Sequence, residues 1–218
     1  RLLTTDIAAS IMAEMMLEPL VVQDADYVPQ PLLATSWEVN DDSTEFTFAI
    51  REGVTFHNGE PMTASDVAFT LRTYLPLAPQ TSLLKDYIEE ITAPDDTTGI
   101  VRLNRPFAPF VAALAGIPIV PESVFGDGQD VLTHPANMAP IGTGPFQLVT
   151  YDQGERIVLS RFEGYWGNRP AINTMVVPII SDQNARLLAF EGGDIDFLYG
   201  SLVDKASYAR MYEMSGVG

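Results

Sequence analysis

The chain has 218 residues, enough for one large domain or two modest ones. Apolar residues make up 46% of it and charged residues 19%, with 11 Phe, 8 Tyr and 2 Trp, a composition that excludes a disordered tail. The formal net charge of −17 disfavours nucleic acid or an anionic lipid surface as a partner, and the lack of cysteine excludes disulfides and thiolate chemistry.

Helix and strand patterns alternate in the first part of the chain. Strong helix formers occupy residues 7–17, and Pro19 ends this helix because the residue before a proline is pushed out of the α region. Thr63 and the acid three residues later, Asp66, form a capping-box start for a helix that Pro76 stops. Apolar spacing and turn formers further predict a short strand at 20–22, hairpins at 32–50 and 88–103, and a short helix at 106–114.

The turn-rich segment APIGTGP, residues 139–145, separates this part from a second compositional block. Beyond it, the patterns predict a hairpin at 146–161, strands at 175–180 and 195–199, and helices at 182–191 and 202–214.

Motifs for catalysis are scarce. The two histidines, His57 and His134, lie far apart in turn-like, polar neighbourhoods, which favours a solvated or hydrogen-bonded turn histidine at each position. The glycine-rich run at 142–144 precedes a strand rather than a helix and lacks the lysine of a phosphate cradle. We therefore expect no catalytic residue, no metal and no cofactor.

One acidic pair leaves an enzymatic alternative open. Asp194 and Asp196 flank Ile195 at strand spacing, so both carboxylates are expected on one face. Paired acids of this kind suit acid–base chemistry, as in a hydrolase, or a hard cation. The competing interpretation is a solvent-facing strand edge in an acidic protein, and a concave pocket around both carboxylates would distinguish the two.

Three separated segments carry a family pattern. The first is residues 32–75, with LATSWE and then IREGVTFHNGEPMTASDV; the second joins 139–151 with 157–166; the third is RLLAFEGGDIDFLYG at 186–200. In this order they resemble the family 5 extracellular solute-binding proteins, which are the oligopeptide, dipeptide and nickel receptors of bacterial ABC importers.

This resemblance implies a mixed α/β fold, the first lobe of a type II periplasmic-binding-protein-like architecture. That lobe would be split into residues 1–33 and 141–218, with an inserted α+β subdomain at 34–140. Family members are much longer, so the second lobe is expected to follow Gly218 and the chain to be an incomplete fragment.

The resemblance also implies a non-enzymatic receptor that binds a small solute between two lobes and passes it to membrane permease subunits. Its expected location is the bacterial periplasm, or the outer face of the cytoplasmic membrane to which it would be anchored. The third segment is similar to nickel receptors, but GIPIVPESVF at 116–125 lacks their arginine-bearing stretch. Short peptides are therefore the first expectation, with nickel chelates or other small solutes as alternatives.

Two short segments match positions that face the ligand in the family. Glu18, Pro19 and Leu20 stand at the start of a cleft-facing strand, where Glu18 would either meet a ligand's ammonium group or be a solvated helix-end carboxylate. Tyr199, Gly200 and Ser201 stand where peptide receptors present Tyr-Asn-Asn, so side-chain contacts from the last two are in doubt. The aromatic residues Trp37, Tyr165 and Trp166 are interpreted as packing anchors rather than ligand-stacking residues.

Overall fold

The computed structural model describes residues 7–77 and 81–198. The chain forms two compact units, one from residues 1–149 and 159–175 and the other from residues 150–158 and 176–218. These limits differ from those expected for the lobe (1–33 and 141–218) and its insert (34–140), and that division stays a prediction. The expected helix at 202–214 lies outside the described residues.

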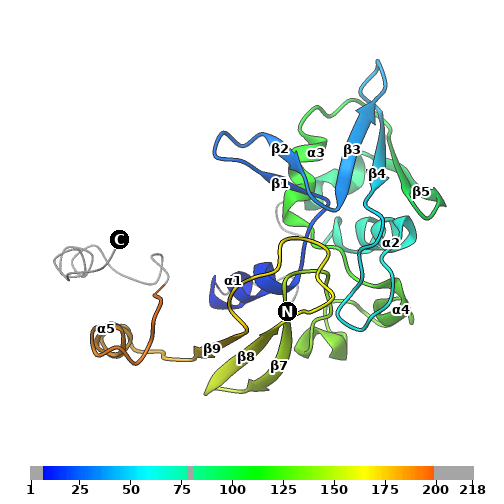
Figure 1. The fold of residues 1–218 in the computed structure, drawn as a ribbon. Coiled ribbons are helices and arrows are strands. Elements are labelled where there is room, and N and C mark those ends of the chain that lie inside the picture. Colours follow the sequence, from blue (N-terminus) through cyan, green and yellow to red (C-terminus); the bar gives the residue numbers. More distant parts are fainter. Residues whose placement is uncertain (1–6, 78–80, 199–218) are drawn as a thin grey trace. The chain divides into compact units, whose positions relative to one another are not determined.

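The first unit begins with α1 (Ile7–Met16) and the antiparallel pair β1 (Val21–Gln23) and β2 (Pro29–Pro31) (Figure 1). The helix and strand expected at 7–17 and 20–22 are confirmed to within one residue at each end. In the turn of this pair, the Asp24 carboxylate accepts hydrogen bonds from the backbone N–H groups of Asp26 and Val28, at 3.0 and 2.9 Å. These bonds present Tyr27, with a positive φ of 62°, at the exposed tip.

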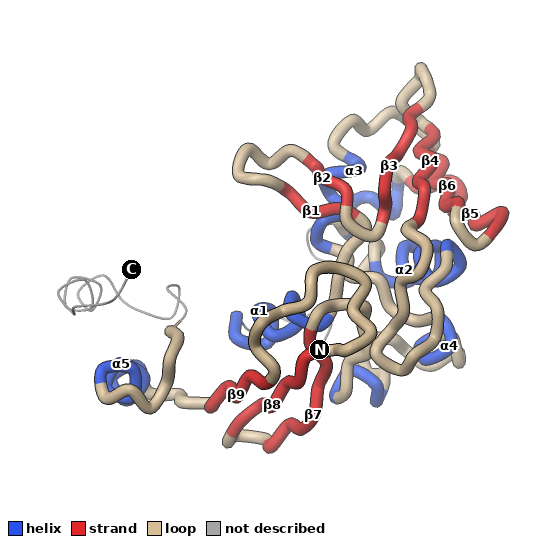
Figure 2. The backbone as a smooth tube through the Cα atoms, in the orientation of Figure 1, coloured by secondary structure: helices blue, strands red, loops and turns tan. Residues whose placement is uncertain are grey.

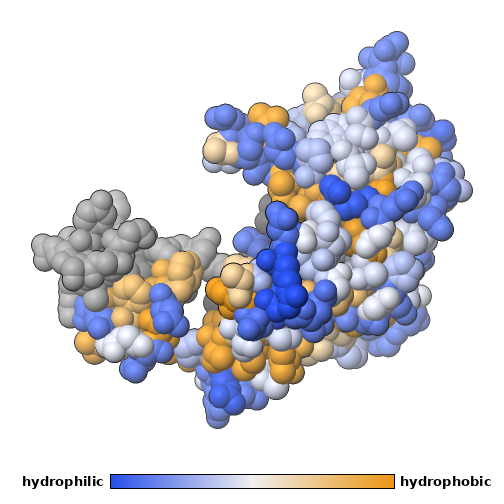
Figure 3. Space-filling model, in the orientation of Figure 1, coloured by the Kyte–Doolittle hydropathy of each residue, from blue (hydrophilic) through white to orange (hydrophobic). Residues whose placement is uncertain are grey.

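A four-stranded antiparallel sheet follows in the order β3-β4-β6-β5 (Figure 2). Its strands are β3 (Ala34–Val39), β4 (Glu45–Ile50), β5 (Ile88–Asp95) and β6 (Thr98–Leu103), so both expected hairpins are confirmed. On β4 the apolar residues at every second position are buried, namely Phe46, Phe48 and Ile50. The tip between β3 and β4 is hydrophilic, as its Asn-Asp-Asp-Ser sequence requires (Figure 3).

Helix α2 (Ala64–Tyr74) packs on this sheet through contacts with β5 and β6. Its predicted start is confirmed, because the Asp66 carboxylate accepts hydrogen bonds from the Thr63 backbone N–H at 2.9 Å and hydroxyl at 3.2 Å. This unit also contains short helices and 3₁₀ turns: η1 (Ser82–Asp86), α3 (Phe110–Ala113), η2 (Leu114–Gly116), α4 (Glu122–Phe125) and η3 (Pro135–Met138).

One buried core unites these elements. Leu20, Val21 and Leu33, from the segment around β1 and β2, pack in the same cluster as the sheet and α2. Trp37 and Trp166 are half-buried and pack against this cluster, which agrees with their interpretation as packing anchors. This packing fixes the segment after α1 against the four-stranded sheet and α2.

A three-stranded sheet has the order β7-β8-β9, from β7 (Phe146–Asp152), β8 (Arg156–Arg161) and β9 (Thr174–Pro178). Helix α5 (Gln183–Glu191) belongs to the second unit, and its predicted N-cap is confirmed because the Asp182 carboxylate accepts a hydrogen bond from the Ala185 N–H at 2.8 Å.

The strand expected at 195–199 is wrong over residues 195–198. Gly193 adopts a left-handed φ of 77° after α5, which turns the chain back on the helix end. The backbone N–H groups of Asp194 and Ile195 then donate to the Ala189 carbonyl, at 2.8 and 3.3 Å. These N–H groups are therefore satisfied at the helix C-terminus and not by a neighbouring strand.

Candidate ligand-binding site

The most distinctive polar group of the first unit is the Glu18 carboxylate, two residues beyond α1. Its side chain is buried, and it accepts hydrogen bonds from the Thr143 hydroxyl, the Tyr165 hydroxyl and the Trp166 indole N–H, each at 2.8 Å. A buried carboxylate is costly unless such donors satisfy it, and bonds to an ionised acceptor are the strong ones. Glu18 therefore joins the end of α1 to two distant segments.

This geometry rules out one of the two interpretations of the Glu18 side chain. A solvated helix-end carboxylate is wrong, because the residue is only 6% exposed. Contact between Glu18 and a ligand's ammonium group stays a prediction.

The two residues after Glu18 are also engaged by the chain itself. Pro19 bridges to Pro118, and the Leu20 carbonyl accepts hydrogen bonds from the N–H groups of Leu32 and Ala34, at 3.3 and 2.9 Å. The Leu20 side chain is 1% exposed and lies in the core. Their role as ligand contacts stays a prediction.

The other three expected ligand residues, Tyr199, Gly200 and Ser201, lie outside the described residues. Their contact with a ligand therefore stays a prediction as well.

The loop at 142–144 reaches the end of α1 because two of its residues are glycines. A Cβ atom at Gly142 would meet the Met16 carbonyl oxygen at 2.2 Å, and one at Gly144 would meet the Met16 carbonyl carbon at 2.7 Å. The Gly144 N–H donates to the same Met16 oxygen at 3.0 Å. The glycines thus serve close backbone packing, and this packing places Thr143 beside Glu18.

His57 holds the same loop from the other side. Its Nδ1 accepts the Gly142 N–H at 3.3 Å, which assigns the proton to Nε2, and Nε2 donates to the Gly144 carbonyl at 3.0 Å. Burial lowers the pKa of His57, and the hydrogen bond to Gly144 opposes this shift in part. His57 therefore acts as a neutral structural clamp.

His134 is buried, and its ring nitrogens also have partners within the chain. Its Nδ1 accepts the Ala136 N–H at 3.1 Å, and its Nε2 lies 3.3 Å from the Asp127 carboxylate. Of the two forms that the sequence leaves open, both histidines therefore have the hydrogen-bonded one.

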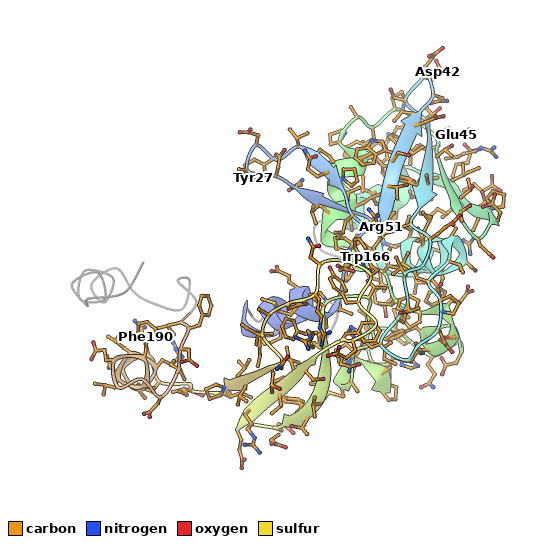
Figure 4. The ribbon with its side chains drawn as sticks, viewed as in Figure 1. Tyr27, Asp42, Glu45, Arg51, Trp166 and Phe190 are labelled. Atoms are coloured by element: carbon orange, nitrogen blue, oxygen red, sulfur yellow. The ribbon has the colours of Figure 1, made fainter. Side chains whose placement is uncertain are left out.

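Arg51 completes the arrangement around Trp166. Its guanidinium carbon lies 4.4 Å from the centre of the Trp166 ring, and its Nε donates to the Leu32 carbonyl at 2.8 Å (Figure 4). The indole therefore contacts a cation with its face and the Glu18 carboxylate with its N–H. Burial, with a further contribution from Glu18, raises the pKa of Tyr165, while the charge of Arg51 opposes that rise.

Sequence reasoning missed Thr143 and Arg51 as members of this cluster. Thr143 was read only as part of a glycine-rich turn, and Arg51 only as part of the family motif. No local pattern pairs either residue with its partner, since the partner lies more than a hundred positions away.

The acidic pair of the hydrolase alternative lies in the second unit. Asp194 and Asp196 are exposed and follow the turn after α5, so the strand spacing that would align their carboxylates is absent. The premise of that alternative is therefore wrong.

Residues 7–77 and 81–198 contain neither a metal cluster nor a membrane-spanning helix. No group of three or more His, Cys, Asp or Glu residues there is arranged to hold a metal ion. In the same residues, every helix is too short or too polar to cross a membrane.

Comparison with known proteins places the chain in a family. Residues 28–215 match the family described as bacterial extracellular solute-binding proteins, family 5 middle. The chain is 38% identical over 180 residues to Protein XP55 of Streptomyces lividans, covering 81% of this chain and 33% of that protein. It is 36% identical over 204 residues to the nickel-binding periplasmic protein of Escherichia coli K12, covering 90% of this chain and 38% of that protein.

The fold agrees with this assignment. The oligopeptide-binding protein AppA of Bacillus subtilis, solved with a nonapeptide, superposes with a TM-score of 0.86 at 26% identity, over 98% of this chain and 43% of AppA. The chain spans roughly a third of the length of the curated relatives above. The expected mixed α/β fold class is confirmed, and the chain belongs to the family 5 bacterial extracellular solute-binding proteins.

Proposed function

We propose that this protein is a solute-binding receptor of an ABC importer and delivers its solute to the membrane permease subunits. The observation that carries the proposal is the family match, which extends over residues 28–215. The receptor is not an enzyme in this proposal. The hydrogen-bonded histidines and the exposed Asp194 and Asp196 support that part of it.

Short peptides are the proposed solute. The likeness to AppA in complex with a nonapeptide supports this choice, as does the segment at 116–125, which resembles peptide receptors. An extended peptide suits a cleft of this family because its backbone pairs with strand ends while loose pockets accept its side chains. A nickel chelate is the alternative, supported by 36% identity to the nickel-binding protein of Escherichia coli.

The proposed place of action is outside the cytoplasmic membrane, in the periplasm or anchored to the outer face of that membrane. The family description as extracellular and the periplasmic nickel-binding relative support this location. Recovery of the native protein in the cytosolic fraction of its own cells would contradict it.

A calorimetric screen of the full-length protein tests the choice of solute. Di- to pentapeptides are titrated alongside nickel with histidine, and simple sugars serve as the negative control. We expect saturable binding of peptides and no heat from sugars. Binding of nickel–histidine alone selects the alternative, and the absence of binding to all of them contradicts the receptor proposal.

A further inference from the structure

Arg51 is held more firmly than an ordinary surface arginine. Its backbone N–H donates to the Leu33 carbonyl at 2.8 Å, its Nε donates to the Leu32 carbonyl at 2.8 Å, and its guanidinium plane lies over Trp166. Trp166 is itself fixed by its hydrogen bond to the buried Glu18 carboxylate. The guanidinium is therefore positioned before any ligand arrives.

The outer edge of this guanidinium has no hydrogen-bond partner in the part of the chain that the structure describes. Its two terminal nitrogens make no hydrogen bond within the described residues, and they are not among the unpartnered polar atoms buried there, so they reach solvent. No carboxylate of the described residues lies within ion-pair distance of Arg51, although the chain contains 29 acidic residues.

Other arginines of the described residues differ in one of these respects. Arg102, Arg156 and Arg161 each pair with a carboxylate of the chain. Arg105 also lies over an aromatic ring, Tyr87 at 4.0 Å, but it is exposed and no side-chain hydrogen bond within the described residues fixes it. Arg51 combines a fixed plane with free terminal nitrogens.

We propose that Arg51 is a solute-binding residue that takes a carboxylate group of the solute through its two terminal nitrogens. A guanidinium edge matches the two oxygens of a carboxylate, and such bidentate pairs are among the strong hydrogen bonds of proteins. Because Trp166 and Leu32 already restrict the side chain, little rotamer freedom is lost on binding. Local positive charge is also what an anionic group needs in order to approach a chain of net charge −17.

The identity of the solute in this inference rests on the proposed receptor function. Both candidate solutes carry the group in question, since a peptide has a C-terminal carboxylate and a nickel-binding amino acid has its own. The shared chemistry is the carboxylate, so the test compares each acid with its amide.

The experiment uses the full-length protein, with Arg51→Gln, Arg51→Lys and the matched control Arg105→Gln, which removes another ring-stacked charge. Calorimetry measures the Kd of a tripeptide and of its C-terminal amide, and of nickel with histidine and with histidinamide. We expect the wild type to prefer the acid by about 10- to 100-fold, the gain of a hydrogen-bonded charge pair. Arg51→Gln should bring the acid to the affinity of the amide, Arg51→Lys should retain part of the preference, and Arg105→Gln should keep all of it.

A second measurement does not depend on the solute. The indole N–H resonance of Trp166, assigned by its loss in Trp166→Phe, is followed while acetate is added, with chloride at equal ionic strength as the control. We expect a saturable shift with acetate in the wild type that is absent in Arg51→Gln.

Each result has one meaning. Equal loss of acid and amide binding in Arg51→Gln, or no preference for the acid in the wild type, overturns the inference while the receptor function stands. An Arg51-dependent acetate shift without binding of any peptide or nickel complex refutes the proposed function but supports the carboxylate site. If acetate causes no shift and neither a peptide nor a nickel complex binds, both proposals are refuted.

Discussion

Replacing Glu18 with alanine tests the role of the buried carboxylate in holding the first unit together. The change leaves the Thr143 hydroxyl, the Tyr165 hydroxyl and the Trp166 indole N–H without their acceptor. Hydrogen bonds to a charged group contribute about 1.5–3 kcal/mol each, and the variant also escapes a desolvation penalty of several kcal/mol for the buried ion. The net of these two opposing effects is an expected fall of about 3–4 kcal/mol in the free energy of unfolding.

Urea denaturation of the full-length protein, followed by tryptophan fluorescence, measures this loss as a lower midpoint with an unchanged slope. Glu14→Ala is the matched control, because Glu14 is an exposed glutamate on α1 and its replacement should change stability by less than about 0.5 kcal/mol. Glu18→Gln keeps the shape and one acceptor oxygen, so its loss should lie between the two. If Glu18→Ala unfolds at the same urea concentration as Glu14→Ala, the carboxylate does not hold these segments together.

Three further predictions follow from the loop at 142–144 and from the acidic pair. Gly144→Ala places a Cβ atom 2.7 Å from the Met16 carbonyl carbon, so a thermal melt should show destabilisation of about 1–3 kcal/mol, and an unchanged melting temperature would refute the close approach. Burial lowers the pKa of His57 in the folded protein below its ordinary 6.5. As the pH falls, the unfolded chain therefore binds a proton at this histidine before the folded protein does. The resulting stabilisation of the folded protein is fully present above pH 6.5 and is lost as the pH falls through the pKa of His57 in the folded protein. Unfolding free energies measured between pH 5 and 8 should show this decline with falling pH and a weaker one in His57→Gln, whereas equal slopes would contradict the assignment. Replacing both Asp194 and Asp196 with asparagine should leave the Kd of the solute unchanged, because both side chains are exposed. A loss of binding in calorimetry would show instead that these carboxylates take part in solute binding.

The elements that the sequence predicts well are those set by near neighbours. The Thr63 and Asp66 capping box lies within one turn, and the strands of the β3–β4 hairpin are joined by a short polar turn. The strand predicted at 195–199 is absent over residues 195–198 because near neighbours in the chain decide the structure there as well. Ile195 and Phe197 do alternate with polar residues. Gly193, however, turns the chain with a left-handed φ, and the Ala189 carbonyl accepts the N–H groups of the next two residues, so they do not pair with a strand.

The candidate site was less accessible to sequence reasoning. Glu18 and Trp166 were each identified, but 148 positions separate them, so no periodic pattern joins them. Their contact depends on the close approach of Gly142 and Gly144 to Met16, which is a property of the folded chain. The same limit applies to Arg51. Its contacts with the Leu32 carbonyl and with the Trp166 ring, which fix its guanidinium, exist only in the folded chain and leave no pattern in the sequence.

Native mass spectrometry of the full-length protein, purified without unfolding, tests whether this protein is a solute receptor. We expect a 1:1 complex with added short peptides, visible as a mass increase equal to one peptide and lost on competition with excess of a second peptide. A protein that stays at its unliganded mass with every peptide and with nickel–histidine would contradict the account.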